Sequence, residues 1–126
     1  MSLESGDADS SQSRGGEPGA QPAAPVNRVT FDRRELDRIF NLYGRKVAAG
    51  EWRDYAIDLG RDAAIFSAFR RATERPEYRI EKRPDLRNRQ GMWVLVGEGG
   101  AILKRGHELG PVLAPVERKL MKLVGV

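Results

Sequence analysis

The chain has no cysteine in its 126 residues and a single histidine, so the residue types that most often carry thiol and metal chemistry are almost missing. Without cysteine, disulfide bonds, thiolate metal sites and thiol nucleophiles are excluded. The one histidine, His107, and the one serine after residue 27, Ser67, lie far apart in the sequence, and neither has a nucleophile motif around it. We therefore expect no catalytic residues, no metal and no cofactor, and interpret the protein as non-catalytic.

Long apolar runs are also missing. No stretch approaches the roughly 20 apolar residues that a membrane-spanning helix needs. The amino-terminal sequence MSLESGDADSSQ has neither the basic region nor the apolar region of a secretion signal. We expect a cytoplasmic protein with no membrane association, and the chain length fits one domain of ordinary size rather than two.

Charge is unevenly distributed along the chain, whose formal net charge is +4. Residues 1–27 hold four carboxylates and one arginine, a net of −3, and Leu3 and Val26 are the only sizeable apolar residues there. Such a segment buries too little apolar surface to offset the entropy of ordering, which predicts a disordered acidic tail. Residues 28–126 hold 21 basic and 14 acidic side chains, a net of +7, and we expect them to form a single α+β domain.

The clearest local signal predicts a helix that begins at Arg33. Asp32 and Glu35 have the spacing of a capping box, in which each side chain accepts a hydrogen bond from the other residue's amide. Apolar side chains then recur every three or four residues as far as Val47, and Gly50 supplies the stop. The result is an amphipathic helix with one face to bury.

After the helix the hydrophobic period changes to two, which is typical of β-strands. Short turns separate five such stretches with no crossover helix between them, which predicts an antiparallel meander and argues against a parallel nucleotide-binding sheet. The second stretch is apolar on both faces and is expected inside the sheet. The predicted strands cover residues 52–59, 63–71, 78–83, 92–96 and 101–105.

The C-terminal stretch has helical spacing of apolar residues but contains two prolines, Pro111 and Pro115, each of which removes an amide. We expect a turn over residues 106–110 and a short helix that begins at or after Pro115. The predicted fold class is therefore α+β, with an N-terminal amphipathic helix, a five-stranded antiparallel meander sheet and a short C-terminal helix.

Two basic stretches are candidate sites for an anion or for nucleic acid. Residues 70–89 hold eight basic and four acidic side chains, a pattern that fits either a track for a phosphate backbone or a solvated sheet face of mixed sign. Residues 104–108 place two cations, a glycine and an imidazole at the junction to the C-terminal helix, where an anion would be favoured. The candidate contact residues are Arg70, Arg71, Arg75, Arg79, Lys82, Arg83, Lys104, Arg105 and His107.

These observations favour a non-catalytic protein-binding or adaptor module, whose partner is another protein. The alternative is a basic accessory protein that binds nucleic acid or another polyanion through an arginine-rich sheet face. Charge alone separates the two interpretations, and the acids interleaved among the arginines favour the first.

Five strings of the sequence carry a resemblance: LYGR at 42–45, AAGEWRDYAID at 48–58, FSAFRRA at 66–72, YRIEKRP at 78–84 and ILKRGHEL at 102–109. Together they resemble the core pattern of a small family of uncharacterised alphaproteobacterial proteins, a domain of unknown function, over about residues 29–113. The resemblance implies a bacterial cytoplasmic protein with one compact domain, and it brings no activity, cofactor or catalytic residue with it. Pro111 and Pro115 look like departures from a more helical C-terminal pattern in that family.

Overall fold

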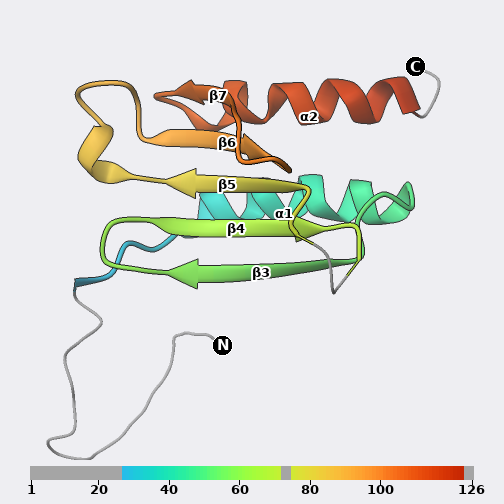
Figure 1. The fold of residues 1–126 in the computed structure, drawn as a ribbon, viewed down its shortest axis with the longest axis horizontal. Coiled ribbons are helices and arrows are strands. Elements are labelled where there is room, and N and C mark those ends of the chain that lie inside the picture. The colour runs from blue at the N-terminus through green and yellow to red at the C-terminus, as the bar shows by residue number, and fades with distance from the viewer. Residues whose placement is uncertain (1–26, 72–74, 124–126) are drawn as a thin grey trace, which may run out of the picture.

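The computed structural model describes residues 27–71 and 75–123 (Figure 1). Of the acidic tail predicted over residues 1–27, all but Asn27 lies outside the described residues. Within the described residues, no helix is both long and apolar enough to cross a membrane. The elements are α1 (Arg33–Ala48), β3 (Asp54–Leu59), β4 (Ala64–Phe69), β5 (Tyr78–Lys82), the 3-10 helix η2 (Pro84–Leu86), β6 (Trp93–Gly97), β7 (Ile102–Gly106) and α2 (Leu109–Leu123).

Helix α1 begins where the capping box predicts. The Glu35 amide donates to Asp32 Oδ1 at 2.8 Å, and the Asp32 amide donates to Glu35 Oε1 at 2.8 Å. After Ala48, the last helical residue, Gly50 adopts a left-handed φ of 80°, a conformation in which a Cβ would be strained. The predicted start and stop of this helix are therefore confirmed.

The five strands form one antiparallel sheet in the order β3-β4-β5-β6-β7, so each strand pairs with its neighbour in sequence. The predicted meander is confirmed. Because the order in space follows the order in sequence, β3 and β7 are the two edges and β4, β5 and β6 lie inside. The burial of β4 agrees with its predicted interior position.

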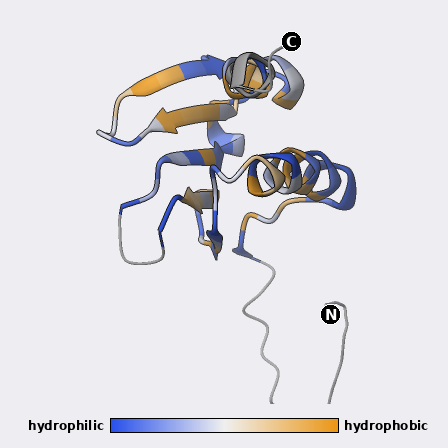
Figure 2. Ribbon diagram, turned by 90° about the vertical axis from the view of Figure 1, so that its right-hand side faces the viewer, coloured by the Kyte–Doolittle hydropathy of each residue, from blue (hydrophilic) through white to orange (hydrophobic). Residues whose placement is uncertain are grey.

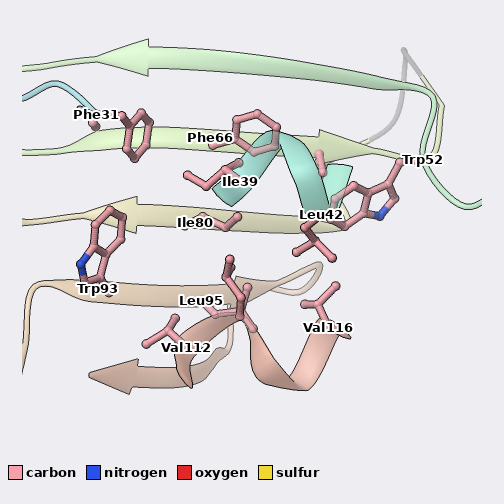
Figure 3. Packing of buried hydrophobic residues seen from close by; sticks show 13 residues of the cluster. Phe31, Ile39, Leu42, Trp52, Phe66, Ile80, Trp93, Leu95, Val112 and Val116 are labelled. Carbon is pink, nitrogen blue, oxygen red and sulfur yellow. The ribbon is translucent and has the colours of Figure 1, made fainter. Parts of the chain in front are cut away.

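Both helices pack on the same face of the sheet (Figure 2). Strand side chains alternate between faces, so every second residue reaches this side. Phe66, Ile80 and Leu95 point from three strands toward the helices, where Ile39 and Leu42 of α1 meet them (Figure 3). The core is therefore a single layer of side chains between one sheet face and two helices.

The position of α2 corrects one expectation. The helix begins at Leu109 rather than at or after Pro115. Pro111 lies in the first turn, where an amide has no acceptor within the helix, so the proline removes nothing that the helix needs. Pro115 does remove one internal hydrogen bond, but the burial of Val112 and Val116 against the sheet holds the helix together across it.

A carboxylate links the two helices. Glu117 of α2 accepts from Arg38 Nη2 of α1, with distances of 3.3 Å to Oε1 and 3.2 Å to Oε2, and lies 3.5 Å from Arg45 Nη2. These contacts join residues from opposite ends of the described chain. Helix α2 therefore closes the core next to α1 rather than projecting from it.

Candidate binding surface

The sheet face opposite the helices, which we call the open face, has no helix on it in the parts of the chain that the structure describes (Figure 2). Figure 1 looks onto this face, and α1 passes behind the strands. The strand registers assign its residues, since directly paired residues share a face. From β3 to β7 they are Asp54, Ala56, Asp58, Ile65, Ser67, Phe69, Arg79, Glu81, Val94, Val96, Ile102 and Arg105, with Arg83 directly after β5.

A buried carboxylate lies near the centre of the open face. Glu81 is only 6% exposed, and two arginines two residues away on either side hold it. Arg83 Nε donates to Oε1 at 2.9 Å, and Arg79 Nε donates to Oε2 at 3.2 Å. These charge-assisted hydrogen bonds satisfy a group that would be costly to bury alone. The interpretation of this stretch as a solvated face is therefore wrong at Glu81, because the period-two spacing lets both guanidinium groups close over it.

Arg105 lies in the same cross-strand row as Glu81, separated from it by Val94. Its side chain is half-buried, and its Nη1 atom is fully buried without a hydrogen-bond acceptor among the described residues. A buried donor that loses water without gaining an acceptor costs stability. Arg105 thus has one buried hydrogen-bond donor, Nη1, that no described residue uses.

Two valines on the open face are nearly inaccessible although no helix or strand of the described residues covers them. Val94 is 2% and Val96 3% exposed. Val94 has Glu81 and Arg105 as its cross-strand neighbours, and long charged side chains cover apolar surface with their stems. Charged residues therefore provide on this face the cover that helices provide on the other.

Charge divides the open face into two halves. Asp54 and Asp58 lie on β3, at one edge of the sheet. Three guanidinium groups and one carboxylate lie over β5, β6 and β7. We call this part of the open face the basic half. The basic half carries Arg79, Glu81, Arg83, Val94, Val96, Ile102 and Arg105.

The other predicted contact residues lie elsewhere. Lys82 faces the helices, where its Nζ donates to Glu35 Oε1 at 2.7 Å and to the Thr30 carbonyl at 2.8 Å, and it lies over the Trp93 ring. This position removes Lys82 from any surface shared with its neighbours in sequence. Because successive strand residues point to opposite faces, one run of basic residues cannot form one patch.

A second group lies at one end of the sheet. Arg70, Arg71 and Arg75 line a cleft of about 130 Å³ together with Glu77 and Glu98. Arg70 already pairs there, since its Nη2 is 3.3 Å from Glu77 Oε2. Carboxylates of the chain itself therefore compensate part of the positive charge of this cleft.

Lys104 and His107, the last two candidates, are exposed at the β7 edge and in the connection from β7 to α2. The nine predicted residues are thus spread over four places rather than one. Within the described ranges, no group of three or more histidine, aspartate or glutamate side chains is placed to hold a metal ion.

An aromatic cluster beside β3 was not predicted from the sequence. The rings of Phe40, Tyr43, Tyr55 and Phe66 contact one another, with centroids 5.1 Å apart for Phe40 and Tyr55 and 5.2 Å apart for Tyr43 and Tyr55. Burial, with smaller contributions from Asp54 and Tyr55, raises the pKa of the Tyr43 phenol. The signal available in the sequence was the helical spacing of Phe40 and Tyr43 together with the following aromatic strand.

The comparisons with known proteins add a family and no function. A family model described as "Protein of unknown function (DUF2794)" matches residues 29–113. No curated protein and no solved structure matches the chain. The matched residues include all five strands, so both faces of the sheet lie within the family model.

Proposed function

We propose, for a chain that belongs to the DUF2794 family of proteins of unknown function, that it is a non-catalytic protein-binding module. Its partner is an acidic segment of another protein, and its binding surface is the basic half of the open face. One observation carries the proposal: the half-buried guanidinium group of Arg105 has a donor, Nη1, without an acceptor among the described residues, and it lies beside two arginines that share one carboxylate.

The chemistry of the surface favours a carboxylate-bearing partner. Three guanidinium groups face one carboxylate there, so the basic half has two positive charges in excess. Hydrogen bonds between guanidinium and carboxylate are strong and directional, more so where water is partly excluded. Ile102, 54% exposed at the rim, adds an apolar contact that a purely electrostatic site would not offer.

The test uses the full chain labelled with ¹⁵N and titrated with a glutamate-rich peptide at low salt. We expect amide shifts confined to β5, β6 and β7, and their loss in Arg105→Ala. Arg34→Ala is the matched control, because it removes an equally charged, exposed side chain from α1 and should leave the shifts unchanged. Shifts that are absent, or that lie on α1, would contradict the proposal.

A photo-crosslinking residue at position 102 extends the test to the native partner. Capture from the source cells should recover a protein that Arg105→Ala fails to recover and Arg34→Ala retains. If Arg105→Ala captures the same protein as the unmodified chain, another surface binds the partner.

A second candidate function, polyanion binding, is favoured by the cleft of Arg70, Arg71 and Arg75. Its weakness is that Glu77 lines the same cleft and Glu81 already occupies Arg79 and Arg83. Binding to mixed RNA and to duplex DNA at two salt concentrations separates the candidates. A steep loss of binding with salt supports the polyanion, and undetectable binding at low salt rejects it.

A further inference from the structure

The outer side of β3 is an apolar edge with no strand paired to it in the described part of the chain. Tyr55 is 43% exposed, and Ile57 and Leu59 are each 37% exposed. Val47, exposed on α1, follows Tyr43 by one helical turn, and the Tyr43 ring contacts Tyr55. An exposed edge strand with apolar side chains is a template for pairing with another strand.

The register with β4 determines which backbone groups point outward. The Gly60 amide donates to the Ala63 carbonyl at 2.9 Å, so Gly60 and Ala63 form a hydrogen-bonded pair. In an antiparallel ladder such pairs recur at every second residue, which directs Asp58, Ala56 and Asp54 toward β4. The amides and carbonyls at positions 55, 57 and 59 therefore face the open edge.

Two side-chain hydrogen bonds occupy part of that edge. The Tyr55 amide donates to Asp54 Oδ1 at 2.8 Å, and the Leu59 carbonyl accepts from Arg28 Nη1 at 3.1 Å. Both of these hydrogen bonds come from side chains of exposed residues, so strand pairing can replace them with ladder hydrogen bonds. Among the residues that the structure describes, no side chain hydrogen-bonds to the outward amide or carbonyl of Ile57, at the centre of the strand.

We propose that β3 is a self-association edge, on which β3 of a second copy of this chain pairs antiparallel about Ile57. The pairing joins two five-stranded sheets into one continuous sheet. Ile57 then faces Ile57 of the second copy, and Tyr55 faces its Leu59, so all outward groups of the strand find ladder partners.

Carboxylates select this register over its neighbours. A shift that pairs Tyr55 with Ile57 of the second copy places Asp54 directly opposite Asp58. The opposite shift places the two copies of Asp58 face to face. Like charges directly opposite each other destabilise a sheet, so centring on Ile57 avoids a penalty that both alternatives incur.

The two side chains that occupy the edge of the monomer are complementary across the proposed interface. Arg28 lies at Leu59, and Asp54 lies beside Tyr55. Since Leu59 of one copy faces Tyr55 of the other, Arg28 of each copy comes next to Asp54 of its neighbour. In the dimer each of these side chains exchanges its hydrogen bond to the backbone for an ion pair. The two-fold symmetry produces two such ion pairs.

Disulfide trapping tests the edge and its register together, because the natural chain has no cysteine and any introduced thiol is unique. Ile57→Cys in the full chain should give a covalent dimer on mild oxidation, since paired residues lie within the Cα separation that a disulfide spans. Leu59→Cys alone should not, because its two copies would lie about 13 Å apart along the strands. Glu98→Cys, in the exposed β6–β7 turn, measures random collision and should also fail.

Sedimentation equilibrium of the unmodified full chain supplies a measurement without cross-linking. We expect a reversible dimer that Ile57→Lys weakens by at least about tenfold, because the ammonium group would be desolvated at the two-fold axis. Ile102→Lys, the same change on the opposite edge, should have no effect. Because Ile57 and Ile102 are both exposed, the two variants are expected to fold, and far-UV circular dichroism checks this.

Several outcomes would overturn the proposal. These are a chain that stays monomeric up to millimolar concentration, Ile57→Cys cross-linking no faster than Glu98→Cys, and efficient cross-linking of Leu59→Cys alone. A dimer that responds to Ile102→Lys instead of Ile57→Lys would place the interface on β7. The proposal is independent of the acidic partner, since Arg105→Ala leaves β3 intact.

Discussion

The two faces of the sheet bury their centres by different means. On the helix side, Phe66 and Leu95 are completely inaccessible beneath apolar residues of α1 and α2. On the open face, Val94 and Glu81 reach similar burial beneath the stems and guanidinium groups of neighbouring arginines. Low exposure therefore marks an apolar core on one face and a cover of charged side chains on the other.

A matched pair of truncations on β4 tests whether the two faces contribute differently to stability. Phe66→Ala, on the helix side, should lower the free energy of unfolding by about 3–5 kcal/mol, because it leaves a cavity among packed rings. Phe69→Ala, on the open face, should cost clearly less, since that ring is half-buried. Denaturant unfolding measures both, and equal losses would refute the distinction.

Removing the charge that holds the open face together should have the next largest effect. Glu81→Gln leaves Arg79 and Arg83 without their anion and should cost about 1–2 kcal/mol, a range that allows for the partial exposure of both arginines. Glu98→Gln, an identical change at an exposed turn, is the control and should be neutral within error. Thermal unfolding of both variants checks this, and an unaffected Glu81→Gln would show that the contacts of Glu81 with Arg79 and Arg83 contribute nothing to stability.

The ion pair between Lys82 and Glu35, on the face that the helices cover, can be compared with the Glu81 contacts on the open face. Lys82→Met keeps the apolar stem over Trp93 but removes the donor to Glu35 and to the Thr30 carbonyl. We expect a loss of about 1 kcal/mol, because the pair is mostly shielded from water while the thioether preserves the packing. Urea unfolding measures it. A loss as large as that of Phe66→Ala would mean that polar contacts, rather than apolar packing, dominate the helix side.

The smallest change in stability is expected for a variant of Arg105, which should affect binding but not folding. Arg105→Met removes the buried donor that lacks an acceptor in the described structure, so stability should stay within about 0.5 kcal/mol or rise slightly. Binding of the glutamate-rich peptide should nevertheless be lost. If the variant unfolds much more easily, Arg105 has a structural role and the binding assignment fails.

The sequence predicted those parts of the fold that depend on local rules. The capping box placed the start of α1 at Arg33, and the two-residue period with short turns predicted all five strands and their order. The C-terminal helix was predicted too late in the chain, because the penalties of Pro111 and Pro115 are local while the burial that outweighs them is tertiary.

The candidate site was harder to predict because it depends on which face the helices cover. Alternation places Arg79 and Lys82 on opposite faces, but the sequence does not show which of them a helix will meet. The partners that neutralise the basic residues are also distant in sequence: Lys82 pairs with Glu35, and Arg70 with Glu51. A run of basic residues in the sequence therefore overstated the charge available to a polyanion.

The link between Glu117 and Arg38 has a consequence for the order of folding. Every strand pairs with its neighbour in the chain, so the sheet can grow by closing short loops at a small cost in chain entropy. The contact of Glu117 with Arg38, by contrast, joins positions 79 residues apart. We expect α2 to dock on α1 after the rate-limiting transition state, so variants of Glu117 should speed unfolding while leaving the refolding rate nearly unchanged.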